Sequence, residues 1–62
     1  MYSGRDIRRV RRANKMTQAK FAHHMGVSRR TVIRWERAGA DWNNYAFERA
    51  QFAKLEQPEL DL

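Results

Sequence analysis

Residues 18–35, which read QAKFAHHMGVSRRTVIRW, carry the spacing that decides the fold of this chain. Phe21, Ala22 and Met25 recur at helical spacing and fall on one face of a short helix. Gly26 follows directly, and glycine adopts the left-handed backbone conformation that ends a helix at little steric cost. The stretch therefore begins with one short helix that stops at a sharp turn.

A second helix is predicted to begin within two residues of that turn. Thr17 and Ser28 can each accept a hydrogen bond from an N–H group one turn into a helix, so they are candidate N-caps of the first and the second helix. Val32 and Trp35 lie three residues apart on a stripe that faces back toward the first helix. Ala22 suits a steep crossing, because a larger side chain would hold the two backbones apart. Two short helices joined by a three-residue turn are typical of a helix-turn-helix.

Arginines occupy the other side of the second helix, at positions 29, 30, 34 and 37. One interpretation is a solvated cationic face. The helix holds a single acid, Glu36, so the arginines lack the acidic neighbours that would support a free surface helix. Arg29 and Arg30 also lie at the helix start, where the helix dipole disfavours cations. An anionic partner would offset that cost, and the pattern favours contact with DNA over a solvated face.

The position of each side chain along the second helix separates the expected roles. The first residues of a recognition helix point at base edges, and arginine can donate two hydrogen bonds to guanine O6 and N7. We therefore predict base reading by Arg29, Arg30 and Arg34, with Ser28 beside them. Ile33 is either a half-buried rim residue or a contact to a thymine methyl group. Arg37 is expected at a phosphate, and Thr31 could contact either a base or a phosphate, or neither.

With these residues in place, the chain resembles the lambda-repressor/Cro-like (XRE-type) helix-turn-helix family. The resemblance runs from about Ile7 to Leu55 and is most specific at residues 16–18 (MTQ), 26–28 (GVS) and 31–36 (TVIRWE). It implies an all-α fold, a small bundle of four helices with a central helix-turn-helix. The chain departs from the family in the fifth helix, which we expect to be missing or reduced to a short turn in residues 57–62. The resemblance also implies a bacterial or phage DNA-binding regulator.

The resemblance assigns further roles by position. It implies that Gln18 binds a phosphate and that Arg11 forms a structural ion pair with Glu36, which holds the first helix against the motif. Additional phosphate contacts are expected from Thr17, Thr31, Lys15, Asn43 and Asn44. The family usually places one residue between Trp-Glu and the next glycine, whereas Arg37 and Ala38 both precede Gly39 here.

Length and charge narrow the class of protein. Sixty-two residues indicate one domain, residues 1–62, with about 57–62 as a short acidic tail. Residues 1–37 hold eleven Lys or Arg and two acids, a net charge of +9, whereas residues 38–62 hold two and five, a net charge of −3. This asymmetry indicates a polyanionic partner at one end.

Other classes of chemistry find little support in the sequence. The chain has no cysteine, no apolar run of membrane-spanning length and no secretory leader, so we expect a cytoplasmic protein that reaches the nucleoid by binding DNA. His23 and His24 point about 100° apart on a helix and cannot share a metal. We expect both to be exposed to solvent, where either could lie near a phosphate. No catalytic constellation, cofactor site or metal site is predicted.

The two flanks of the motif are predicted to be helical. Ser3 and Asp6 form a capping signal for a helix from Gly4 or Arg5 to about Asn14, and the last helix is expected over about 45–56. Candidate N-caps for the last helix are Asp41, Asn43 and Asn44. Trp42 could be a core residue, a stacking residue near the DNA backbone or an interface anchor. The last helix carries more apolar surface than one face can bury. This surface either packs inward or forms a dimer face that includes Phe47, Phe52, Leu55 and Leu60.

The sequence therefore predicts a sequence-specific transcriptional regulator, expected to be a repressor. Its recognition helix, expected over Ser28–Glu36, would enter the major groove of double-stranded DNA, and a homodimer would bind a palindromic operator with G-containing half-sites. The alternative is the antitoxin of a toxin–antitoxin pair, which would bind a toxin protein and regulate its own promoter.

Overall fold

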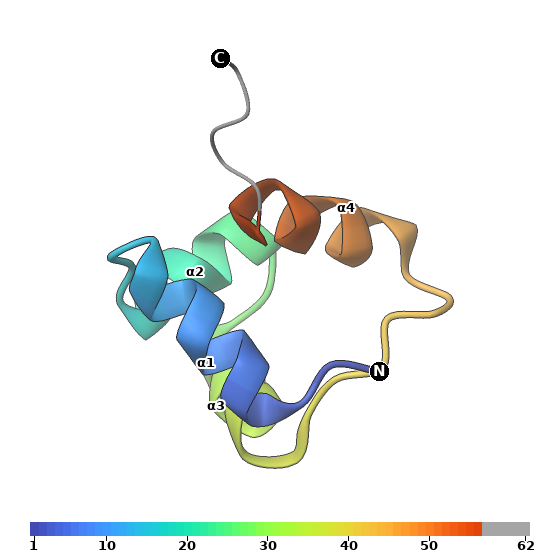
Figure 1. Ribbon diagram of the computed structural model, residues 1–62, viewed down its shortest axis with the longest axis horizontal. Coiled ribbons are helices and arrows are strands. Elements are labelled where there is room, and N and C mark those ends of the chain that lie inside the picture. The colour runs from blue at the N-terminus through green and yellow to red at the C-terminus, as the bar shows by residue number, and fades with distance from the viewer. Residues whose placement is uncertain (57–62) are drawn as a thin grey trace.

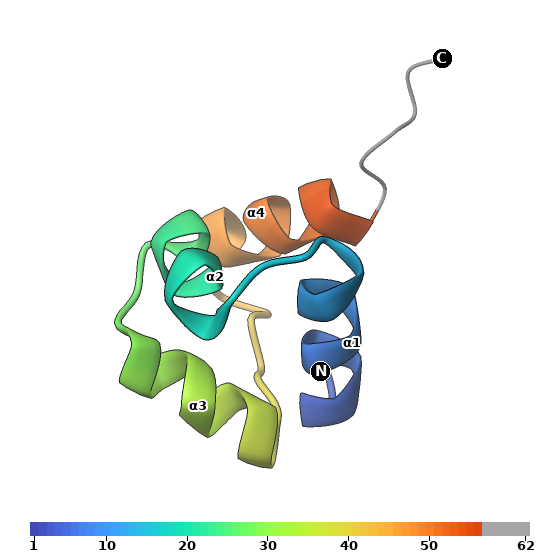
Figure 2. The same ribbon diagram turned by 90° about the vertical axis from the view of Figure 1, so that its left-hand side faces the viewer.

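Four helices account for most of residues 1–56, the part of the chain that the computed structural model describes (Figure 1). They are α1 (Gly4–Ala13), α2 (Gln18–Met25), α3 (Arg29–Ala38) and α4 (Ala46–Glu56). Helices α2 and α3 pack against each other, α1 packs on α3, and α4 lies across α1 and α2 on another side of the core (Figure 2). The predicted all-α fold with four helices is confirmed. No helix in the described part is long and apolar enough to cross a membrane.

The side chains predicted as caps begin the first three helices. Ser3 Oγ accepts from the Asp6 N–H at 3.1 Å, and Thr17 Oγ1 accepts from the Lys20 N–H at 3.0 Å. Ser28 Oγ accepts from the Thr31 N–H at 3.2 Å. Each bond satisfies one of the N–H groups that have no partner within the helix, which fixes where the helix starts.

Glycines end α2 and α3, and the end of α3 requires one correction. Gly26 closes α2 in the left-handed conformation, with φ of 73°. The expected bounds Ser28–Glu36 of the recognition helix are wrong at its end, because α3 continues through Ala38. It stops only at Gly39, where φ is 88° and the N–H donates to the Trp35 carbonyl at 2.7 Å. The extra residue before this glycine is therefore absorbed into the helix.

The core joins apolar residues from every helix to the segment after α3. Its buried members are Ile7, Val10, Phe21, Ala22, Met25, Val32, Ala40, Trp42 and Phe52. Trp42 is a core residue, with its ring centre 4.9 Å from that of Tyr2, 5.0 Å from Trp35 and 5.1 Å from Phe52. The structure thus selects the first of the three interpretations of Trp42.

The N-terminal segment pairs with the segment that follows α3, which the sequence did not predict. Tyr2 and Ala40 form an antiparallel bridge in which each N–H donates to the other's carbonyl at 2.9 Å. Figure 1 shows this strand-like pair at the N-terminus. The bridge brings Tyr2 against Phe52 of α4, with ring centres 5.0 Å apart.

The structure shows which apolar residues of α4 pack inward and which face solvent, and it corrects the predicted dimer face. Phe52 is fully buried against Phe21, so it cannot contact a second copy. Leu55 is half-buried and packs against the core, whereas Phe47 remains 58% exposed. Leu60 lies outside the described residues. The apolar surface of α4 is thus divided between an inward and an outward face.

The loop before α4 departs from the predicted capping. Asp41 Oδ1 accepts from the Asn43 N–H at 3.1 Å, within the loop itself. The described residues show no bond from the side chain of Asp41, Asn43 or Asn44 to the first turn of α4, which begins at Ala46, one residue later than expected. The Tyr45 carbonyl accepts from the Arg49 N–H at 3.1 Å and opens the helix without a side-chain cap.

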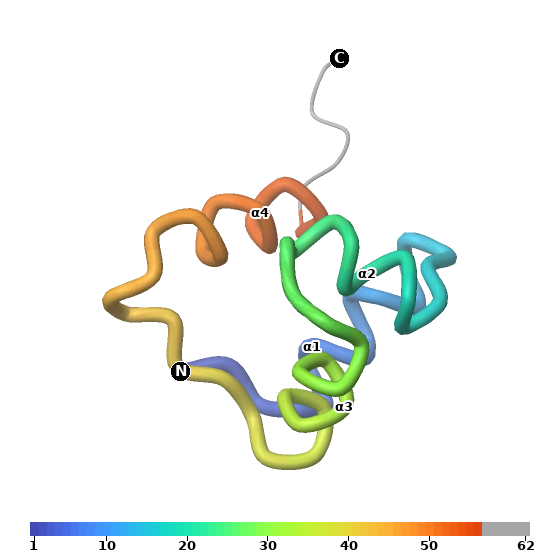
Figure 3. The backbone as a smooth tube through the Cα atoms, turned by 180° about the vertical axis from the view of Figure 1, so that it is seen from behind, coloured from blue at the N-terminus to red at the C-terminus, as the bar shows by residue number. Residues whose placement is uncertain are grey.

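The end of α2 lies beside α4 (Figure 3). A reciprocal pair of hydrogen bonds joins the two helices. His24 Nε2 lies 2.8 Å from the Gln51 carbonyl and donates to it, because a carbonyl can only accept. Gln51 Nε2 donates in return to the His24 carbonyl at 2.8 Å, one of the carbonyls left free at a helix end. The expectation that both histidines are exposed holds for His23 and is wrong for His24, which is half-buried.

Candidate nucleic-acid interface

The outward face of α3 is cationic. Arg30, Arg34 and Arg37 are spaced by four and three residues, so they share the face opposite the buried Val32. These arginines and Arg29 are all exposed, and none has a side-chain hydrogen bond or ion pair within residues 1–56. The four guanidinium groups therefore present their donors outward, ready for an external acceptor.

Polar and apolar side chains flank these arginines at the start of α3. Ser28 is exposed, and its hydroxyl lies 3.1 Å from Thr31 Oγ1 in addition to capping the helix. Thr31 and Ile33 are half-buried. Ile33 is therefore a half-buried residue at the rim of the core, and the exposed part of its side chain could contact a thymine methyl group.

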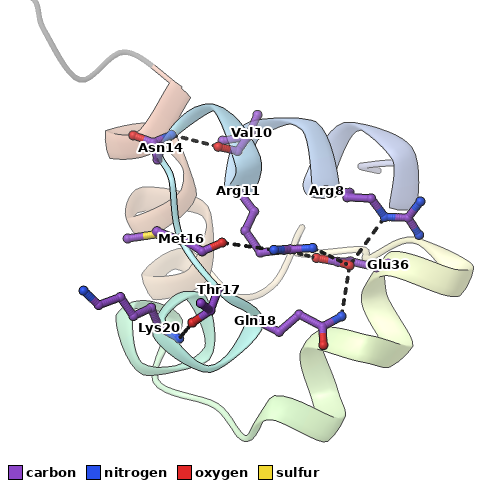
Figure 4. A network of polar contacts seen from close by, with 9 residues as sticks. All are labelled: Arg8, Val10, Arg11, Asn14, Met16, Thr17, Gln18, Lys20 and Glu36. Carbon is purple, nitrogen blue, oxygen red and sulfur yellow. Dashed lines mark hydrogen bonds and ion pairs between the residues drawn. The ribbon is translucent and has the colours of Figure 1, made fainter.

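A buried carboxylate joins the three N-terminal helices (Figure 4). The side chain of Glu36 is only 4% exposed. Arg11 donates to Glu36 from Nε at 2.5 Å and from Nη2 at 3.3 Å, and its Nη1 donates to the Met16 carbonyl at 3.0 Å. Arg8 Nε lies 3.5 Å from Glu36 Oε1. The structure thus brings together Arg11 and Glu36, the two residues that the resemblance paired.

The surroundings of Glu36 keep it ionised. Burial alone would raise the pKa of Glu36, but hydrogen bonds from Arg11 and Gln18 and the positive charges of Arg11 and Arg8 outweigh it. The pKa of Glu36 is therefore lower than that of an ordinary glutamate. The carboxylate remains a charged acceptor at neutral pH, which a bidentate guanidinium partner requires.

Gln18 is part of the same network, which the sequence did not reveal. Its Nε2 donates to Glu36 Oε1 at 3.2 Å (Figure 4). A side-chain amide has two N–H groups, so this bond leaves one donor for a phosphate. Glu36 therefore fixes the amide of Gln18 at the start of α2.

The sequence also did not reveal the role of Gly4, which sets the distance between α1 and α3. A Cβ atom at Gly4 would overlap the backbone carbonyl oxygen of Glu36 and lie 2.6 Å from its carbonyl carbon and 3.0 Å from the Trp35 carbonyl oxygen. Only glycine lets the start of α1 approach the end of α3 this closely. A glycine in the first turn of a capped helix is a poor helix former, which was the one available signal.

The remaining predicted phosphate contacts lie in the connecting segments. Lys15 is exposed in the turn after α1, with φ of 57°, and Thr17 is exposed at the start of α2. Asn43 and Asn44 are exposed in the loop before α4. Arg49 holds that loop, since its Nη1 donates to the Asn43 carbonyl at 2.5 Å and to the Trp42 carbonyl at 3.4 Å.

Comparison with known proteins places this geometry in a family. The family model described as "Helix-turn-helix" matches residues 7–41, more than half of the chain. The match covers α1 from Ile7 onward and all of α2 and α3, and it ends before α4, so it is shorter than the expected resemblance to Leu55. No curated protein and no solved structure matches the chain. The chain therefore belongs to the lambda-repressor/Cro-like (XRE-type) helix-turn-helix family of DNA-binding regulators.

Proposed function

We propose that the chain is a sequence-specific transcriptional repressor that inserts α3 into the major groove. The observation that carries this proposal is the outward face of α3, where exposed arginines have no acidic partner in the described part of the chain. Arg29 and Arg30 lie at the N-terminal end of α3, the end that reads bases in this motif. Arg34 follows one turn after Arg30 and extends the reading along the groove.

The expected base preference follows from these side chains. Arginine pairs with guanine O6 and N7, so half-sites should contain guanine where Arg29, Arg30 and Arg34 reach the bases. Ser28 lies beside them, and Ile33 supplies an apolar surface for a thymine methyl group. Phosphates would be held by the remaining predicted residues, namely Gln18, Thr17, Thr31, Arg37, Lys15, Asn43 and Asn44.

The outward face of α4 supports a homodimer. Ala46, Ala50 and Ala53 are exposed and share one side of the helix. Phe47 lies beside them, and a Cβ atom at Gly26 would lie 3.4 Å from the edge of its ring. Small side chains allow a second helix to approach closely, and a 58% exposed phenylalanine can act as its anchor. Phe47 replaces Phe52 as the central residue of the predicted dimer face. Two copies related by two-fold symmetry would bind a palindromic operator.

The base-reading assignment is tested by selecting binding sites from random DNA and titrating the best site at several salt concentrations. We expect Arg30→Ala to weaken binding to that site by about 1–3 kcal/mol and to relax the preference at one base position. Lys54→Ala, which removes a cation from α4, should change specific binding little. If Arg30→Ala weakened binding to the specific site and to random DNA equally, Arg30 would contact phosphate and not a base.

The dimer is tested by sedimentation of the wild type and of Phe47→Asp, with Glu56→Gln as a control at the exposed end of α4. We expect Phe47→Asp to lower the dimer fraction and the affinity for a full palindrome, while the affinity for a half-site is kept. A wild type that stays monomeric with and without DNA would contradict the dimer. If that monomer also bound a small protein encoded beside it, the same face would support the antitoxin alternative.

A further inference from the structure

The outward face of α1 carries four arginines that the proposed function does not use. Arg5, Arg8, Arg9 and Arg12 are exposed and recur at helical spacing on the side opposite the buried Ile7 and Val10. Together with Ala13 they line a shallow depression on the surface. This group of four arginines, Arg5, Arg8, Arg9 and Arg12, is called the α1 arginine face below.

Acidic side chains of the protein neutralise only a small part of the positive charge on this face. Arg9 meets Asp6 at 3.2 Å, but both side chains are more than half exposed, and such pairs contribute little. Arg8 shares Glu36 with Arg11. Arg5 and Arg12 have no hydrogen-bond or ion-pair partner within residues 1–56. Four cations over two turns of helix repel one another, so an external anion would relieve the repulsion.

The α1 arginine face and the outward face of α3 point in different directions. Figure 2 shows α1 and α3 on different sides of the core, and Ile7 of α1 and Val32 of α3 are both buried in it. Each outward face is the one opposite these buried residues, so the two faces diverge. A duplex held in its major groove by α3 therefore leaves most of the α1 arginine face uncovered.

We propose that the α1 arginine face binds the phosphate backbone of a second DNA duplex, so that the protein can hold two duplexes at once. From Arg5 to Arg12 the helix rises about 10 Å, and over that length a duplex presents about six phosphates. Arginine also suits phosphate, because its planar fork donates two parallel hydrogen bonds. The face lacks the apolar anchor that an acidic peptide or a membrane would engage, since its lining apart from arginine is Ala13 alone. The inference goes beyond operator reading and applies to a duplex of any sequence.

A capture assay tests the second duplex directly. One duplex is attached to beads and saturated with protein, and a fluorescent duplex of unrelated sequence is then titrated at several salt concentrations. The test variant is Arg5→Gln/Arg12→Gln, because neither side chain supports the fold through a hydrogen bond or ion pair in the described structure. The matched control is Lys20→Gln/Lys54→Gln, which removes the same charge from α2 and α4. Circular dichroism and binding of the first duplex are measured for all proteins.

We expect the wild type and the control to capture the second duplex, and the test variant to capture at least ten-fold less while it binds the first duplex within about three-fold. The slope of log affinity against log salt for the second duplex should fall by about two, one unit for each phosphate contact removed. Equal capture by the test variant and the control would overturn the proposal, since the bridging would then come from the two α3 helices of a dimer. Absence of capture by the wild type, or an equal loss of first-duplex binding in the test variant, would also overturn it.

Discussion

Replacing Arg11 by methionine removes the main partner of a buried charge. Arg11 makes two hydrogen bonds to Glu36 and one to the Met16 carbonyl. Methionine keeps a long apolar side chain in place, so the substitution removes the charge and the donors more than the packing. Glu36, which is 4% exposed, would keep only the amide of Gln18 at 3.2 Å and the guanidinium of Arg8 at 3.5 Å.

The expected loss of stability is large for a domain of this size. Breaking a buried ion pair from one side costs about 3–5 kcal/mol, because it strands an uncompensated charge. The two contacts that remain to Glu36 place Arg11→Met at the lower end, about 3 kcal/mol. A chain of 62 residues has a free energy of unfolding of roughly 3–9 kcal/mol. The midpoint of thermal unfolding should therefore fall by about 12–24 °C.

Urea unfolding followed by circular dichroism at pH 7 measures this loss. Arg12→Met is the matched control, since Arg12 is exposed and has no partner within residues 1–56, and it should change stability by less than about 0.5 kcal/mol. The double variant Arg11→Met/Glu36→Leu removes both charges and should recover much of the loss. A loss below about 1 kcal/mol for Arg11→Met, or a double variant as unstable as Arg11→Met, would refute the role of this pair.

Four further substitutions probe the pH response and the packing. The pKa of Glu36 is lowered in the folded protein from the ordinary glutamate value of 4.5. Its stabilising contribution is therefore present above that pH and declines as the pH falls through the folded value, so the difference in unfolding free energy between the wild type and Glu36→Gln should shrink from pH 6 to pH 3. A difference that grows on acidification would contradict this sign. Gly4→Ala should destabilise by about 1–3 kcal/mol in urea unfolding, because its Cβ would overlap the backbone at Glu36, and a stabilised variant would show that α1 can move away from α3. Phe52→Ala should cost about 3–5 kcal/mol in the same assay and Phe47→Ala less than 1, and similar losses would mean that the inward and outward faces of α4 are misassigned.

Local chemistry explains why the motif was predictable. Ser3, Thr17 and Ser28 cap helices through bonds three residues along the chain, and Gly26 ends α2 through its own backbone conformation. Such features depend on neighbours in sequence, so a single sequence reveals them. The outward arginines of α3 follow from the same periodicity, whereas their contacts to bases and phosphates stay predictions.

Long-range packing explains what was missed. Tyr2 forms backbone hydrogen bonds with Ala40, and Gly4 lies close to the backbone of residues 35 and 36. No local sequence pattern predicts contacts between positions so far apart in the chain. Helix α4 offered two apolar strips, and only the position of the aromatic cluster decides that Phe52 faces inward. Trp42 lies in a loop, where periodicity gives no direction at all.

The position of Glu36 links the stability of the fold to the charge of the outward face of α3. It is the one acid in α3, and on the outward face of that helix it would repel phosphate and compete for arginine. The structure instead turns it inward, where Arg11, Arg8 and Gln18 satisfy it and where it holds α1 and α2 against α3. The free-energy cost of burying this carboxylate is offset because those donors come from two other helices. The same residue that assembles the three helices thus leaves α3 with no acid of its own on its outward face. Asp41 and Glu48 line a pocket beside Arg34 but form no ion pair with it within residues 1–56, so the exposed arginines can still accept an external anion.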